Sequence, residues 1–227
     1  MKFEDLKFMQ LFGNCACIKY LGKDRLKGPV DNVDCRNLDT IKLLLTNKYY
    51  ETLMSAPYTT EEHIPMFEKD SNTKYLFDFV HILHINPFTE EHKEQLKLRI
   101  KRFNNFYKKV KTNENYYFTI SLNGALIDRF SHKLNKKLCL AIINYLREQK
   151  LLSKCIFVGT KLIKGHNDWN YWSPEFIKIV KQYKLKYVEI KDLSLFHQDT
   201  SQKQFKQQVW KYLKPKPKVE KSNYLYF

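Results

Sequence analysis

The sequence between residues 8 and 21 restricts the fold of this chain more than any other stretch. Residues 8–12 form an apolar run interrupted by one glutamine, which is typical of a buried strand, whereas residues 15–21 carry apolar side chains at helical spacing. Gly13 and Asn14 lie between them, and both residue types tolerate a sharp reversal of the backbone. The stretch therefore predicts a strand that turns abruptly into a helix.

Cys15 is the first residue of this predicted helix, and such a turn exposes it at the carboxyl edge of a sheet. A thiol at a helix N-terminus faces unpaired backbone N–H groups and the positive end of the helix dipole, which favour the thiolate. The pattern thus predicts a cysteine nucleophile. The alternative is that Cys15 is a small buried apolar residue, as most cysteines are.

Strands and helices alternate along the rest of the chain. Short apolar runs predict strands, and amphipathic segments preceded by capping residues or proline predict helices. The expected strands cover residues 75–84, 116–122, 155–159 and 186–190, and the expected helices cover about 38–54, a long segment after Pro87, 134–149, 174–183 and 201–213, with a loop at 56–72. This alternation indicates an α/β fold, a mostly parallel sheet flanked by helices on both faces. We expect a single α/β domain of catalytic type over residues 1–213 and a basic tail over 214–227.

The carboxyl ends of parallel strands form the functional crevice in folds of this class. Residues 13–15, 81–84 and 121–124 all fall at predicted strand ends. A cysteine nucleophile needs a base within hydrogen-bond reach, and His81 and His84 are the best-placed candidates. Their spacing puts them on opposite faces of a strand, so only one of them can serve Cys15. The alternative is a pair of strand-end histidines with no chemical role.

The chain carries a formal net charge of +16 and has a sequence pI of about 9.5. Such a charge suits nucleic acid, but the lysines are dispersed and no nucleic-acid recognition motif accompanies them, and an anionic small ligand uses the same field. We therefore do not favour nucleic acid. No apolar run is long enough to span a membrane, and no signal peptide is recognisable. The five scattered cysteines indicate a reduced, cytoplasmic protein without a zinc or other metal site.

Three further charged residues are candidates for the site. Asp31 follows Gly28 and Pro29, and it can either orient a histidine or close a turn. Arg99 and Arg102 can bind phosphate or carboxylate in a fork geometry, or they can be solvated residues of a basic helix.

Four short motifs together resemble a family of papain-like cysteine peptidases of uncharacterised function. They are Gly13-Asn14-Cys15, Arg25 followed by Pro29-Val30-Asp31-Asn32, Phe79-Val80-His81, and Arg99-Ile100-Lys101-Arg102-Phe103. The resemblance covers about residues 6–123. The Gly-Asn-Cys motif is also similar to that of WcbI-type capsule-polysaccharide biosynthesis proteins, which pair a cysteine with a histidine and bind coenzyme A. The chain departs from the family pattern at Val30, Asn32, Ile82 and Leu98.

The resemblance implies Cys15 as nucleophile and His81 as base, with Asp31 and Arg99 as support. Candidates for binding substrate or phosphate are Arg25, Arg99 and Arg102, and His84 is the alternative base. We expect acyl transfer by a hydrolase or an acyltransferase, with backbone N–H groups near Gly13 and Asn14 holding the oxyanion. The expected partners are a small-molecule acyl donor, such as a coenzyme A thioester, and a polar acceptor. The acceptor is either water or a sugar hydroxyl. We expect no other cofactor. The alternative is a non-catalytic binding module for an anionic ligand or nucleic acid.

Overall fold

We describe the fold from a computed structural model of the chain. The described residues are 2–13, 21, 26–31, 34–35, 37–55, 58–61, 64–67, 77–78, 90–122, 124–161, 170–191 and 198–213. Within them, no helix is both long and apolar enough to cross a membrane.

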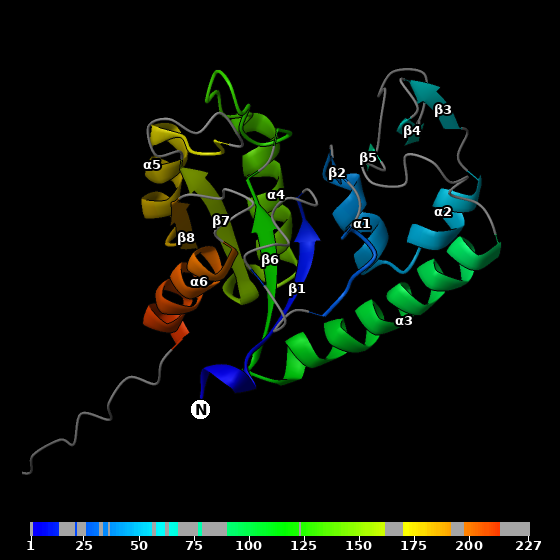
Figure 1. Cartoon of the computed structure of the whole chain (residues 1–227), viewed down its shortest axis with the longest axis horizontal. Coiled ribbons are helices and arrows are strands. Elements are labelled where there is room, and N and C mark those ends of the chain that lie inside the picture. Colours follow the sequence, from blue (N-terminus) through cyan, green and yellow to red (C-terminus); the bar gives the residue numbers. More distant parts are fainter. Residues whose placement is uncertain are drawn as a thin grey trace, which may run out of the picture.

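A four-stranded parallel sheet forms the centre of the fold, which confirms the predicted α/β class (Figure 1). Its strands are β1 (Lys7–Phe12), β6 (Tyr116–Ser121), β7 (Cys155–Lys161) and β8 (Lys186–Lys191), and they lie side by side in chain order. Because parallel crossovers are right-handed and the strand order never reverses, the connecting helices pack on one face of this sheet.

This first face carries the larger core. Its helices are α1 (Asp39–Leu45), α2 (Tyr49–Ser55), α3 (Glu90–Thr112), α4 (Lys136–Glu148) and α5 (Pro174–Tyr183). Phe118 of β6 lies at the centre, with its ring centroid 5.6 Å from that of Phe103 and 5.4 Å from that of Phe106, both on α3. The apolar stripe of α3 is thus fixed to the middle of the sheet.

The second face is covered by α6 (Gln198–Leu213), which lies in front of the sheet in Figure 1. Phe205 of α6 packs edge-on against Phe8 of β1, with ring centroids 5.3 Å apart. On the same helix, Gln204 and Gln208 bond the backbone of the edge strand β8: their Oε1 atoms accept from the amides of Lys191 at 2.8 Å and Glu189 at 3.0 Å. These bonds satisfy an edge that would otherwise be open to another strand.

A second, antiparallel sheet was not expected. It consists of β2 (Asp34–Cys35), β5 (Phe77–Asp78), β4 (Ile64–Phe67) and β3 (Tyr58–Glu61) in that order, and Figure 1 shows it on the β1 side of the parallel sheet, beyond α1. The prediction of a loop over 56–72 is therefore wrong where β3 and β4 form a hairpin. The described part of the predicted strand 75–84, Phe77–Asp78, also belongs to this sheet and not to the parallel one.

The other predicted elements agree closely with the structure. Asn135 caps α4 by accepting from the Leu138 amide at 3.1 Å, and Ser173 caps α5 just before Pro174. The helix expected over 38–54 is divided into α1 and α2, because Asn47 adopts a left-handed conformation at φ 58° that interrupts it.

Candidate active site

The backbone leaves β1 through Gly13, whose φ of +138° is accessible almost only to glycine. A Cβ atom built there would lie 2.4 Å from the Cβ of Ser121, the last residue of β6. Gly13 is therefore required both by its backbone conformation and by the close approach of the neighbouring strand. This agrees with the sharp turn predicted after the first strand.

Polar side chains line the second face of the sheet just before this turn. Gln10, Thr119 and Ser121 are each no more than 2% exposed, and Gln10 lies beside Thr119 in the β1–β6 register. The register shifts after Gln10, so that Leu11 and Phe12 both enter the first-face core while Gln10 stays opposite. Within the described part of the chain, the buried Thr119 hydroxyl has no hydrogen-bond partner. A polar patch in an otherwise apolar sheet thus lies directly below Gly13.

The second sheet is attached to the same turn. The amide of Cys35 in β2 donates a hydrogen bond of 3.0 Å to the carbonyl oxygen of Gly13. Cys35 also pairs with Phe77 of β5, and Asp34 pairs with Asp78. β5 is therefore linked to the carboxyl end of β1 through β2, which bonds the Gly13 carbonyl oxygen and pairs with β5.

Residues 26–31 run along the open edge of β1 towards Gly13. The amide of Leu26 donates to the carbonyl oxygen of Phe8 at 2.9 Å, and a Cβ atom on Gly28 would lie 3.1 Å from the Cγ of Met9. Asp31 follows in a turn and is only 3% exposed. A carboxylate is rarely buried without a structural or chemical role, and the position of Asp31 in a turn after Gly28 fits both the turn-closing and the histidine-orienting alternatives.

The structure separates the two candidate arginines. Burial raises the pKa of Tyr49 well above its ordinary value, nearby Cys35 raises it further, and the positive charge of Arg99 opposes both. Arg99 therefore lies within electrostatic reach of the buried Tyr49 and is itself half-buried on α3. Arg102 is exposed on the same helix. The two arginines thus differ in burial.

The remaining predicted site residues lie outside the described part of the chain; they are Asn14, Cys15, Arg25, His81 and His84. Of the predicted residues that are described, Gly13 ends β1 and Asp31 lies in the turn after Gly28, beside β1, whereas Arg99 lies on α3. Sequence reasoning missed Cys35 and, in the polar patch, Gln10 and Thr119. Gln10 gave a visible signal as the one polar residue of the run 8–12.

The described thiols are poor competitors for a reactive cysteine. Cys35, Cys139 and Cys155 are buried, and none forms a disulfide within the described part of the chain. Burial raises the pKa of Cys139 and the pKa of Cys155 to about 12 each, although Lys186 acts against the shift at Cys155. Among the described residues, no group of three or more His, Cys, Asp or Glu side chains is arranged to hold a metal ion.

Comparisons of the chain with family models, with curated proteins and with solved structures found no match.

Proposed function

We propose that this protein is a cysteine-dependent enzyme of acyl transfer, with Cys15 as nucleophile and His81 as its base. The observation that carries the proposal is Gly13, a glycine at φ +138° between the end of β1 and the Asn14-Cys15 pair. The link from Gly13 through Cys35 to the β5 segment supports the pairing with His81, three residues after β5. Asp31 is proposed as a supporting residue because it lies in the turn after Gly28, beside β1, and Arg99 because its motif resembles that of the family.

The proposed reaction has two steps. His81 accepts the thiol proton of Cys15, the sulfur bonds to the acyl carbon, and the bond to the leaving group breaks as that group takes the proton from His81. Backbone N–H groups that follow Gly13 hold the negative oxygen during this step. His81 then removes a proton from the acceptor, and the acyl group passes to that oxygen while the Cys15 thiol is restored.

The proposed substrates are a small acyl donor and a polar acceptor. A coenzyme A thioester suits the net charge of +16, because its phosphates are attracted by a positive field. The acceptor is water for a hydrolase and a hydroxyl, such as that of a sugar, for an acyltransferase. A papain-like relationship, which the motifs around Cys15 and His81 support, is part of the same proposal. A cytoplasmic location is also part of it.

Acylation of the enzyme tests the proposal. After incubation with acetyl-coenzyme A or p-nitrophenyl acetate, intact-protein mass spectrometry is expected to find one acetyl group, located on Cys15 by peptide mapping. Cys15→Ser should abolish the adduct, and His81→Ala should slow its formation by about 10²- to 10⁴-fold because the general base is lost. Cys139→Ala is the control and should acylate at the wild-type rate. An acetyl group found on another residue, or none at all, would contradict the proposal.

The second candidate function is a non-catalytic module that binds an anionic ligand. The high positive charge favours it, and so does a cluster of cations far from Gly13. Such a module would bind its ligand with a strong salt dependence and would contain no cysteine that is preferentially acylated.

A further inference from the structure

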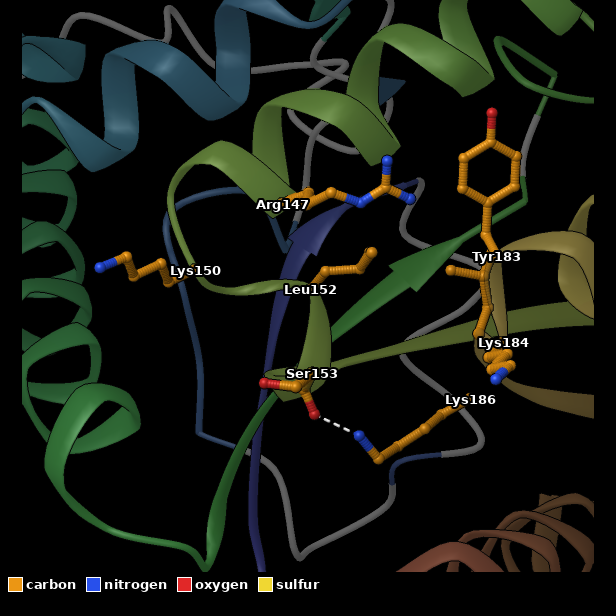
Figure 2. A pocket seen from close by; sticks show the side chains of 8 residues that line it. Arg147, Lys150, Leu152, Ser153, Tyr183, Lys184 and Lys186 are labelled. Atoms are coloured by element: carbon orange, nitrogen blue, oxygen red, sulfur yellow. Dashed lines mark hydrogen bonds between the residues drawn. The ribbon is translucent and has the colours of Figure 1, made fainter.

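A basic pocket of about 440 Å³ lies at the end of the parallel sheet opposite to Gly13, where β7 and β8 begin. It is lined by residues from the end of α4, the end of α5 and the start of β8, and its cations are Arg147, Lys150, Lys184 and Lys186. Leu152, Leu185 and Tyr183 contribute apolar surface, and no carboxylate lines it. Figure 2 shows Arg147, Lys184 and Lys186 around the pocket, whereas the Lys150 side chain points away from them.

The pocket is built from two copies of the same helix-ending turn. After α4, the Lys150 amide donates to Arg147 and the Leu151 amide to Leu146; after α5, the Lys184 amide donates to Lys181 and the Leu185 amide to Val180. In this motif one residue is left-handed, and glycine is strongly preferred there. Here both positions are lysines, at φ 56° and φ 51°. A lysine in this conformation costs stability at both positions.

The fold uses part of this charge, because cations near helix C-termini oppose the negative ends of the helix dipoles. Carbonyl oxygens in the last turn of each helix accept from backbone amides, so these oxygens are not capped by the cations. Arg147 lies over the Tyr183 ring at 5.0 Å, and the Lys186 ammonium donates to the Ser153 carbonyl oxygen. Across the described part of the chain, no ion pair joins any of the four cations to a carboxylate. The pocket therefore holds positive charge that an anion can neutralise.

The Lys186 ammonium is partly desolvated. Burial lowers the pKa of Lys186, nearby Cys155 raises it, and the positive charge of Lys154, which lies outside the pocket lining, lowers it. A bound anion would offset both lowering effects, because it would pair with the ammonium in a partly desolvated place.

We propose that this pocket binds a small organic molecule that carries a diphosphate or triphosphate group. The guanidinium of Arg147 suits phosphate oxygens through its planar set of donors, and Lys184 and Lys186 supply further positive charge. The volume lies in the range of small-molecule sites, and the apolar side chains can contact the organic part. The site lies at the opposite strand ends from Gly13, so it is separate from the proposed acyl-transfer site.

Isothermal titration calorimetry with pyrophosphate, ADP and adenosine tests the proposal on the full chain. ADP and pyrophosphate should bind at one site and adenosine should not, because it has no phosphate. Arg147→Gln and Lys186→Gln should each weaken ADP binding by about tenfold or more. Lys137→Gln removes the same charge from the other end of α4 and should leave the affinity unchanged.

Two glycine variants separate a binding role from a structural one. Lys184→Gly and Lys150→Gly both relieve a left-handed lysine, so both should raise the melting temperature. Only Lys184→Gly should weaken ADP binding strongly, because Lys150 points away. Equal losses of affinity from Lys184→Gly, Lys150→Gly and Lys137→Gln would overturn the proposal, as would the absence of saturable binding. Binding confined to long single-stranded RNA would also overturn it. Cys15→Ser should not alter ADP affinity, so this test stands apart from the acylation test.

Discussion

Replacement of Gly13 by alanine is expected to destabilise the protein by roughly 2–6 kcal/mol. The backbone at φ +138° is strained for any residue with a side chain, and the new methyl group would meet Ser121 at 2.4 Å, far inside van der Waals contact. The two effects add, and their sum is a large fraction of the stability of an ordinary domain. Urea unfolding followed by circular dichroism measures the change as a lower midpoint.

Gly124→Ala is the matched control for this prediction. No atom lies within 4 Å of a Cβ built at Gly124, so the same change should have little effect there. Adding Ser121→Gly to Gly13→Ala should recover only part of the loss, because it removes the contact but not the backbone strain. If Gly13→Ala were as stable as wild type, the turn described after β1 would be wrong.

Alkaline pH is expected to weaken the fold through its buried thiols. The pKa values of Cys139 and Cys155 are about 12 in the folded protein, against about 9 for an ordinary thiol. A raised folded pKa means that the contribution to stability is complete below pH 9 and is lost as the pH rises towards 12. Between pH 9 and pH 10.5 the two thiols together should cost about 3 kcal/mol.

The slope of unfolding free energy against pH tests this prediction. Above pH 9, Cys139→Ala and Cys155→Ala should each make the slope shallower, even though both variants lose stability at neutral pH. Cys139 gives the simpler result because burial is the cause of its shift, whereas Lys186 also acts on Cys155. Ile143→Val, a buried change that does not titrate, should lower stability equally at every pH. A slope unaffected by either cysteine variant would contradict the burial of these thiols.

The parallel sheet and its helices were predictable because their signals are local. The apolar run before Gly13, the Asn135 cap and the Ser173-Pro174 start each determine an element from a few neighbouring residues. The second sheet was not predictable in this way. Its strands β2 and β5 are two residues long each, and they exist because they pair with each other and because Cys35 bonds the Gly13 carbonyl. The apolar run over 75–84 predicts a strand where β5 lies, but not its antiparallel partners, and nothing in Asp34–Cys35 marks it as a strand.

The candidate site shows the same division. Gly13 could be selected from the sequence because a glycine directly after a predicted strand has a clear physical reason. The difference in burial between Arg99 and Arg102 could not be predicted, because it depends on which side of α3 packs against the rest of the fold. The basic pocket was also missed. Its cations come from the ends of α4 and α5 and the start of β8, which are distant in sequence and meet only in the folded chain.

The most direct test of the proposed thiol chemistry is the reactivity of Cys15 with iodoacetamide across pH. The label is located by mass spectrometry in wild type and in the Cys15→Ser and His81→Ala variants. Cys35, Cys139 and Cys155 are buried, so they should add little labelling in the folded protein. The proposal predicts fast labelling of Cys15 with a thiol pKa well below the free value of roughly 8.5, and a higher pKa in His81→Ala. Slow labelling of Cys15 with an ordinary pKa that His81→Ala leaves unchanged would contradict it.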